Sequence, residues 1–394
     1  MDTRIYAGIF VNLRSLNESM QFNQVIAQAE LKNQLIQSVK NDKISQAMLF
    51  LGAEGTGKLS MAIAFAQYVN CEQPNDEDSC GSCASCVKCS KMIHPDVFYT
   101  YPTIGSKSLS RACIENWREF LAEESYFKYP DWIAQLTNEN KQGNITAEEC
   151  NQIIRQHSLR HFEGKYKVQI IWGAEFLKKE GNRLLKLIEE PPANTIFILI
   201  AQSQEAILPT ILSRTQLVKF PKLQLDELSS ALVSCKDLSP EEALKIAQIA
   251  DGSWREAKDL IGQTTHNYFE EFRGWLLNII QLNNRPSHSF AQNLVDWNEN
   301  MAASGRQNQK AFLQYTLFFI REGLAARNNL PSRLDTKERN VAIKMIDIIT
   351  WRKMLGISQI INNLHYQIVR NANAKIAFLS TSMKIKALHK PQAF

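Results

Sequence analysis

A short apolar run leads directly into a glycine-rich loop, and this order constrains the fold more than any other part of the sequence. The run covers residues 48–51, and the loop reads Gly52-Ala53-Glu54-Gly55-Thr56-Gly57-Lys58. Glycines at these positions leave backbone N–H groups free to surround phosphate oxygens, and the lysine supplies a counter-charge. Helical apolar spacing follows Lys58, so the segment predicts a strand, a phosphate loop and a helix within an α/β nucleotide-binding sheet.

Four cysteines lie just behind this predicted helix, at Cys71, Cys80, Cys83 and Cys86. Two thiolates separated by two residues can reach one tetrahedral metal from a single tight turn, and four sulfurs close a structural zinc site. Cys89 continues the same two-residue step, so it is an alternative ligand to Cys86. The spacing therefore predicts a structural zinc module.

Length and composition indicate an ordinary globular protein. The chain has 394 residues, of which 44% are hydrophobic and 22% charged, and two or three domains are expected. Its net charge of +5 permits contact with a polyanion without requiring it. There is no run of 18 apolar residues, and residues 1–19 lack the apolar centre of a secretory signal. We therefore expect a cytoplasmic protein with no membrane span, whose thiols bind metal rather than forming disulfides.

Strand and helix patterns alternate as far as residue 222. Further strands are predicted over residues 97–101, 168–171 and 195–200, and Pro191-Pro192 ends a helix predicted over residues 181–190. Another helix is predicted over residues 24–39. Residues 103–145 are less regular and rich in aromatic side chains. We expect them to form a packed helical insertion, with a lineage-specific binding surface as the alternative.

Beyond residue 222 the sequence predicts only helices. Ser239-Pro240-Glu241-Glu242 supplies an N-cap, a proline at the first helical position and a capping-box glutamate, and Ser253 with Glu256 repeats the box. Later helices are predicted over residues 312–324, 342–355 and 358–369. The predicted domains are a tail (1–19), an α/β domain (20–222), a small helical lid (223–267) and an all-α domain (268–394).

The phosphate loop lacks two groups that ATP hydrolysis requires. The residue after the lysine usually has a hydroxyl group that holds Mg²⁺, but Leu59 stands here. An ATPase also carries carboxylates at the tip of a neighbouring strand, whereas the strand at 168–171 continues into Trp172 and Gly173. Glu175 is expected in the first turn of the next helix, where the helix dipole favours it. The sequence predicts no hydrolysis, and it leaves binding of ATP or ADP open.

Several motifs occur in a characteristic order: the phosphate loop, C-x8-C-x2-C-x2-C, His94-Pro95-Asp96, residues 184–192 (LLKLIEEPP) and residues 211–215 (ILSRT). In this order the chain resembles the AAA+ clamp-loader subunits of bacterial DNA polymerase III, over about residues 20–262. The resemblance implies an α/β AAA+ P-loop domain with an inserted zinc module, followed by a helical lid and an all-α C-terminal collar domain. It implies the zinc ligands Cys71, Cys80, Cys83 and Cys86.

Within this family, Leu59, Trp172 and Gly173 resemble the delta-prime (stator) type rather than the gamma/tau motor type. The resemblance implies that Arg214 acts as an arginine finger in trans, although Thr215 replaces the cysteine of the family motif. Arg255 matches a second sensor position, and it either contacts nucleotide or pairs with Glu256 or another nearby acid. The remaining implied nucleotide contacts are Gly52, Gly55, Thr56, Gly57, Lys58 and Leu59.

The partners that the resemblance implies are gamma/tau and delta subunits in a hetero-pentamer, the sliding clamp, and primed DNA held through its phosphates. It implies no intrinsic ATPase, only membership of the DNA-directed DNA polymerase III holoenzyme. Two alternatives stay open. One is an active gamma/tau-type clamp-loader ATPase, and the other is a zinc-dependent nucleic-acid-binding adaptor outside replication.

Overall fold

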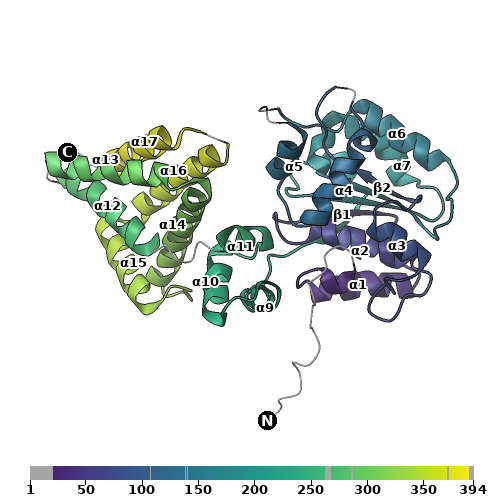
Figure 1. Cartoon of the computed structure of the whole chain (residues 1–394), viewed down its shortest axis with the longest axis horizontal. Helices are drawn as coiled ribbons and strands as arrows, with labels where there is room; N and C mark the ends of the chain where they lie inside the picture. The colour runs from purple at the N-terminus through teal and green to yellow at the C-terminus, as the bar shows by residue number, and fades with distance from the viewer. Residues whose placement is uncertain are drawn as a thin grey trace, which may run out of the picture. The chain divides into compact units, whose positions relative to one another are not determined.

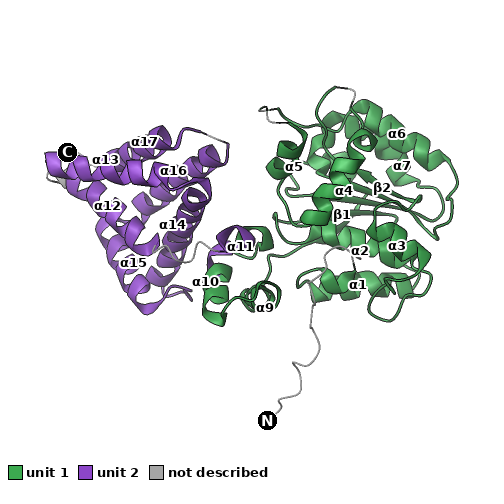
Figure 2. Cartoon of the chain, viewed as in Figure 1, with its two compact units in different colours: residues 1–247, 251–256 green, residues 248–250, 257–394 purple. Residues whose placement is uncertain are grey.

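The computed structural model describes residues 21–106, 108–137, 139, 141–261, 268–284, 287–370 and 372–389. The predicted tail, residues 1–19, lies outside the described residues. The chain forms two compact units, one of residues 1–247 and 251–256 and the other of residues 248–250 and 257–394 (Figure 2). Residues 223–267, predicted to form a lid, are divided between these units, and the predicted domain boundaries stay predictions.

The first unit, which includes the strands labelled β1 and β2 in Figure 1, contains a five-stranded parallel sheet. The strand order is β2-β3-β4-β1-β5. All four predicted strands are present within one residue at each end, and a fifth short strand precedes Phe220. Strands buried on both faces carry near-continuous apolar runs, which is why the sequence revealed them. The strands are β1 (Ala47–Leu51), β2 (Val97–Thr100), β3 (Lys167–Trp172), β4 (Thr195–Ala201) and β5 (Gln216–Lys219).

The sheet separates two hydrophobic cores, because alternate residues of a strand point to opposite faces. Met48 and Phe50 belong to one core, and Ala47 and Leu49 belong to the other. The first core is covered by α1 (Ala29–Lys40) and α2 (Lys58–Asn70), with the short α3 (Ala84–Ser90) beside α2. The second is covered by α6 (Ala147–Ser158), the 3-10 helix η3 (Ala174–Leu184), α7 (Leu185–Glu189) and α8 (Pro209–Leu212).

The aromatic insertion is a packed helical element, as predicted. Its two ends meet in an antiparallel bridge between Thr103 and Asn144. Between them lie η2 (Ser110–Cys113), α4 (Ile114–Glu123) and α5 (Tyr129–Leu136). Trp117 and Trp132 are fully buried in the first core, where the Trp117 ring stacks on Tyr101 at a centroid distance of 4.0 Å.

The predicted capping signals are confirmed at the helices that follow the sheet. The Ser239 side chain accepts a hydrogen bond from the Glu242 backbone at the start of α10 (Pro240–Ala250), with the proline in the first turn. Ser253 likewise caps α11 (Trp254–Leu260), accepting from the Glu256 backbone at 3.3 Å. The helix before these two is α9 (Leu225–Lys236).

The second unit is helical, with α12 (Tyr268–Asn284), α13 (His288–Ala303), α14 (Arg306–Arg327), α15 (Thr336–Ile349), α16 (Trp351–Val369) and α17 (Ala374–His389). The single helix predicted over residues 342–355 is wrong, since Thr350 has φ +73° and separates α15 from α16. The apolar spacing continues across this corner, so periodicity alone could not reveal it. Within the described part of the chain, no helix is both long and apolar enough to span a membrane.

The helix predicted over residues 24–39 is also shorter than expected. The chain forms a 3-10 turn, η1 (Phe22–Gln24), and α1 begins only at Ala29. Ala27 and Gln28 have φ values of +54° and +59°, which no continuous α-helix accommodates. Val25 and Ile26 are nevertheless buried, so their apolar character reflects core packing beside the helix rather than within it.

Candidate functional site

The phosphate loop connects the carboxyl end of β1 to α2, as predicted. Gly55 and Gly57 have φ values of +76° and +86°, in the left-handed region that glycine occupies without strain. Gly57 is the residue that precedes the first turn of α2. At Gly52 a β-carbon would lie 2.4 Å from the carbonyl oxygen of Phe220, so only glycine fits there. The loop therefore has the backbone form of a phosphate cradle.

The loop lysine is folded back on its own loop. Lys58 Nζ donates hydrogen bonds to the carbonyl oxygens of Gly52 at 2.7 Å and Ala53 at 2.5 Å, and the residue is only 7% exposed. Burial lowers the pKa of Lys58 to about 8, although the carboxylates of Glu54 and Glu175 oppose this change. The ammonium group of Lys58 is thus hydrogen-bonded to carbonyl groups of its own loop.

The two groups that hydrolysis requires are replaced by packing residues. Leu59 is buried in the first hydrophobic core. At the tip of β3, the ring of Trp172 lies 4.9 Å from that of Phe127, and Gly173 follows with φ +72°. Glu175 stands in the first turn of η3, as expected, and accepts a hydrogen bond from the backbone N–H of Gln202. Its carboxylate therefore joins two segments at the edge of the sheet.

Arg255 is paired with an acid of the insertion. Its Nε lies 3.2 Å from Oδ2 of Asp131, which is in the first turn of α5. The neighbouring Glu256 forms an ion pair with Lys128, the residue before α5. Of the two roles that the sequence left open for Arg255, the ion pair with a nearby acid is present in this structure.

Arg214 lies near the amino-terminal ends of the parallel strands, whereas this chain's phosphate loop lies at their carboxyl-terminal ends. Gln216 is aligned with Met48 in the parallel ladder, so Arg214 precedes β5 while Gly52 follows β1. A separation of six residues along parallel strands corresponds to roughly 20 Å. Arg214 Nε donates to Glu189 Oε2 at 2.8 Å, which joins the predicted motifs at 184–192 and 211–215. The arginine therefore lies far from its own loop.

The cysteine module brings four sulfurs together. The Sγ atoms of Cys71, Cys80, Cys83 and Cys86 all lie within 4.8 Å of one another, and Cys80 and Cys86 are 3.9 Å apart. Four sulfurs at 2.3 Å from a tetrahedral zinc would be about 3.8 Å apart, so the set fits such an ion. Cys89 is 2% exposed and belongs to the first hydrophobic core instead.

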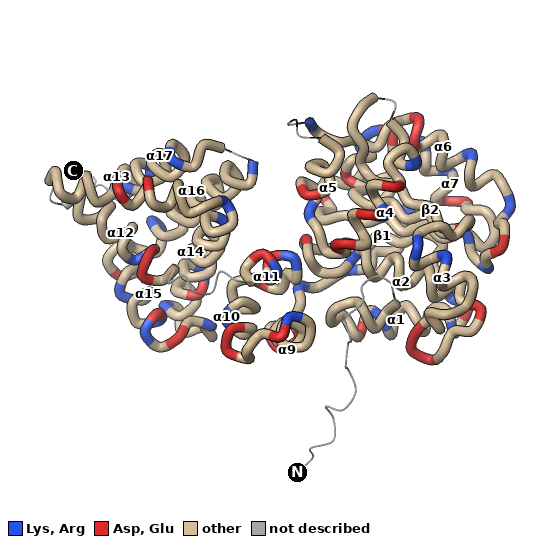
Figure 3. The backbone as a smooth tube through the Cα atoms, in the orientation of Figure 1, with Lys and Arg blue, Asp and Glu red and all other residues tan. Residues whose placement is uncertain are grey.

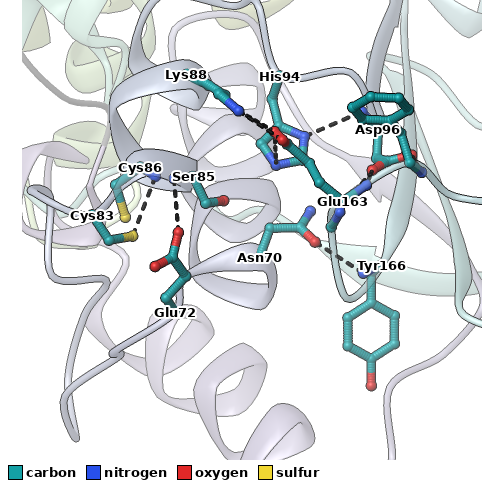
Figure 4. A network of polar contacts seen from close by, with 12 residues as sticks. Asn70, Glu72, Cys83, Ser85, Cys86, Lys88, His94, Asp96, Glu163 and Tyr166 are labelled. Carbon is teal, nitrogen blue, oxygen red and sulfur yellow. Dashed lines mark hydrogen bonds and ion pairs between the residues drawn. The ribbon is translucent and has the colours of Figure 1, made fainter.

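Backbone groups support these sulfurs. The N–H groups of Cys80, Cys83 and Cys86 donate to the preceding cysteine sulfurs at 3.2, 3.3 and 3.4 Å. Figure 4 shows the last of these contacts, between Cys86 and Cys83. Such N–H groups favour the thiolate form that a metal requires. The module can therefore hold a metal ion through side chains that its own turns position.

Two roles that the sequence did not reveal belong to Asp96 and Tyr126. The Asp96 carboxylate accepts backbone hydrogen bonds from Phe162, Glu163 and Gly164 at 2.7–2.8 Å and so fixes that loop (Figure 4). The His-Pro-Asp motif marked this residue, but its partners are more than 60 residues away. Tyr126 lies beside the phosphate loop, and only its place in an aromatic-rich segment drew attention to it.

The chain is similar in sequence to known proteins. The chain is 27% identical over 258 residues to the DNA polymerase III subunit delta' of Bacillus subtilis (strain 168), covering 65% of each chain. It is 28% identical over 249 residues to subunit tau of the same organism, covering 62% of this chain and 37% of that protein. It thus spans less than two thirds of the length of these relatives.

Among solved structures, a DNA polymerase III gamma subunit-related protein from Thermotoga maritima is 12% identical over 92% of this chain and 100% of its own. The TM-score for this pair is 0.35. A family model described as "DNA polymerase III, delta subunit" matches residues 27–224, which is half of the chain. The chain therefore belongs to this family of DNA polymerase III clamp-loader subunits.

Proposed function

We propose that the chain is a delta-prime-type stator of the DNA polymerase III clamp loader. It supplies Arg214 in trans to a neighbouring ATPase subunit while the sliding clamp is loaded on primed DNA, and it hydrolyses no ATP itself. The observation that carries this proposal is the contrast between the two ends of the strands in one sheet. At the carboxyl-terminal end, beside the phosphate loop, Leu59 and Trp172 stand where an ATPase has the groups that hold Mg²⁺ and water. At the amino-terminal end, Arg214 is held in place by Glu189.

The main alternative is an active ATPase of the gamma/tau type, since the relatives include both subunit types at similar identity. The side chain of Leu59 has no oxygen with which to hold Mg²⁺ and is buried in the core. Trp172 packs against the insertion in place of a strand-tip acid. Both changes lie in this chain's own site, and they favour the stator.

Arg214 has the properties that an arginine finger needs. Its guanidinium is planar and permanently charged, and it suits a γ-phosphate that develops charge in the transition state. The side chain is 32% exposed and its partner Glu189 is 55% exposed. An exposed ion pair of this kind contributes about 0–1 kcal/mol, so a phosphate can displace Glu189 at little cost.

A structural zinc ion fits the module formed by Cys71, Cys80, Cys83 and Cys86. The four thiolates fill a tetrahedral shell and leave no open position for substrate, so the ion would cross-link the loop rather than catalyse. The side chain of Asp78, within the module, accepts hydrogen bonds from the backbone of Phe22 at 3.0 Å. The module thereby anchors the segment that precedes α1.

The proposed partners are gamma/tau and delta subunits in a hetero-pentamer, together with the clamp and primed DNA. Lys and Arg are interspersed with Asp and Glu along both units (Figure 3), and the net charge is only +5. This distribution favours phosphate contacts shared over several subunits, which would be salt-sensitive and independent of sequence. Tight DNA binding by the isolated chain would instead support an adaptor outside replication.

The test is ATP turnover by a complex reconstituted from this chain, the motor subunits, the clamp opener, the clamp and primed DNA. Arg214→Ala should reduce turnover at the adjoining motor site by about 10³-fold. Lys58→Ala should leave turnover unchanged. Arg183→Ala is the matched control, because Arg183 is a partly exposed arginine paired with Glu180 at 2.9 Å in the same unit. If Lys58→Ala reduces turnover and Arg214→Ala leaves turnover unchanged, the chain is an active ATPase instead.

A further inference from the structure

The space beside the phosphate loop is filled by a side chain of the insertion. Tyr126 is 5% exposed, and a β-carbon on Gly57 would lie 3.0 Å from its hydroxyl oxygen and 3.3 Å from its ring. Gly57 immediately precedes α2, where the backbone N–H groups of a phosphate loop face the ligand. Tyr126 therefore lies against the last glycine of the phosphate loop.

Tyr126 also takes up a backbone donor near the loop. Its hydroxyl oxygen accepts a hydrogen bond from the backbone N–H of Ile26 at 2.9 Å, in the segment before α1. Next to it, the hydroxyl of Ser60 in the first turn of α2 donates to the carbonyl of Ser125 at 3.5 Å. The insertion therefore contacts the segment before α1 and the first turn of α2, the helix that follows the loop.

Charged contacts hold this segment in place. Lys128 pairs with Glu256, and Asp131 pairs with Arg255, with all four side chains between 19% and 34% exposed. Glu54, within the phosphate loop itself, accepts a hydrogen bond from the backbone N–H of Tyr129, and burial raises the pKa of this carboxyl group. The insertion is thus tied to the loop and to the start of α11.

The start of α11 covers the loop from another direction. The backbone N–H of Trp254 donates to the carbonyl oxygen of Gly55 at 3.0 Å. A β-carbon on Gly55 would lie 2.1 Å from the hydroxyl oxygen of Ser253. The Tyr126 ring lies 6.4 Å from the Trp254 ring, so the insertion and α11 meet over the loop. Tyr126 and the residues at the start of α11 therefore both contact the phosphate loop.

We propose that residues 124–131, which we call the plug segment, occupy the nucleotide site of this chain and compete with ATP for it. The plug segment contacts both the phosphate loop and the residues at the start of α11, Arg255 and Glu256. In this proposal it takes the place that a nucleotide would have between them. This inference deepens the proposed function, because a stator with a self-filled site keeps one conformation while its neighbours cycle. It also gives the aromatic insertion a role.

If the plug segment competes with ATP, variants that weaken its contacts should bind ATP more tightly than the wild type does. When only a fraction of molecules has an open site, the apparent dissociation constant is the intrinsic constant divided by that fraction. Two variants loosen the plug segment independently. Tyr126→Ala removes the side chain over Gly57, while the double variant Lys128→Gln/Asp131→Asn removes both ion pairs. The asparagine keeps an oxygen that can accept the hydrogen bond from the Lys128 backbone, which Asp131 accepts at 2.9 Å.

The experiment measures binding of Mg²⁺·ATP to the full chain by equilibrium dialysis, with melting curves as the check on folding. Either variant should bind ATP at least about tenfold more tightly than the wild type. Adding Lys58→Ala to either variant should remove the gain, which assigns it to the phosphate loop. Lys88→Gln/Glu163→Gln is the matched control, since it removes a partly exposed ion pair elsewhere in the unit and should leave binding unchanged.

The proposal is overturned if the folded variants bind ATP no more tightly than the wild type does. Failure of the stator role is a separate result, because it is read from Arg214→Ala in the reconstituted complex. Tight ATP binding by the variants, combined with normal turnover of the Arg214→Ala complex, would retain the plug segment and reject the arginine finger.

Discussion

Replacing the loop lysine by methionine should stabilise the protein at neutral pH, and the gain should fade as the pH rises. The pKa of Lys58 falls from 10.5 to about 8 because the group is buried. A shift of this size corresponds to about 3 kcal/mol of unfavourable free energy for holding the charge in the folded state. Methionine fills the space of the lysine stem without the charge, and its loss of two hydrogen bonds to loop carbonyls does not depend on pH.

The sign follows from the proton balance. Below pH 8 the lysine is charged in both states, so the folded wild type bears the whole cost. Between pH 8 and 10.5 the unfolded chain binds more protons than the folded one, so wild-type stability rises with pH. Above 10.5 both forms are neutral and the cost is gone. The stability of Lys58→Met relative to wild type should therefore fall by about 3 kcal/mol between pH 7.5 and 11.

The assay is urea unfolding at a series of pH values, followed by hydrogen-exchange mass spectrometry of peptides from α2. A peptide readout is needed because the two units need not unfold together. Leu59→Met is the matched control, since it changes a neighbouring buried side chain and introduces no titrating group. If the difference between Lys58→Met and wild type is the same at every pH, the lysine carries no buried charge and the account of the loop is wrong.

Three further predictions concern other parts of the site. Cys83→Ser should lower the zinc content of the purified protein from one equivalent to almost none and increase hydrogen exchange over residues 71–90; full retention of zinc would contradict the four-sulfur site. Asp96→Asn should cost about 3 kcal/mol at pH 7, since hydrogen bonds to a charged group are lost. Burial alone would raise the pKa of Asp96, but its backbone partners hold it below its ordinary value, so this contribution is present above pH 4 and is lost in acid; urea unfolding at pH 7 and pH 3 should show the difference shrinking. Gly173→Asp, which restores an acid at the tip of β3, should cost about 1–2 kcal/mol because φ is +72°, and should yield no phosphate release; hydrolysis by this variant would contradict the stator assignment.

The sheet and the capped helices were readable from the sequence because their signals are local. Parallel strands are buried on both faces, so each appears as an unbroken apolar run between polar segments. The box at Ser239 marks the start of α10, and Asp251 marks its end. The four cysteines of the module were recognisable for the same reason, since their spacing within one loop is what brings the sulfurs together.

Features that depend on distant partners were not readable. Thr350 adopts φ +73° although the apolar spacing on either side suggests one continuous helix. Several acids could have paired with Arg255, and the fold of the first unit brings Asp131 to it. Tyr126 contacts the Ile26 backbone across 100 residues of chain, and nothing in the local sequence of either residue indicates the contact. These features depend on packing between residues that are distant in the sequence, so local sequence patterns do not predict them.

The segment before α1 has a consequence for how the protein is made. Its backbone and side chains depend on groups that are synthesised later: Asp78 for Phe22, Ser79 for Gln21, and Tyr126 for Ile26. The last of these is 100 residues downstream, which at about 5–20 residues per second corresponds to about 5–20 s of translation. The phosphate loop, which ends at Lys58, is synthesised within that interval, before the tyrosine that covers it. The segment before α1 can therefore complete its native contacts only after Tyr126 has been made.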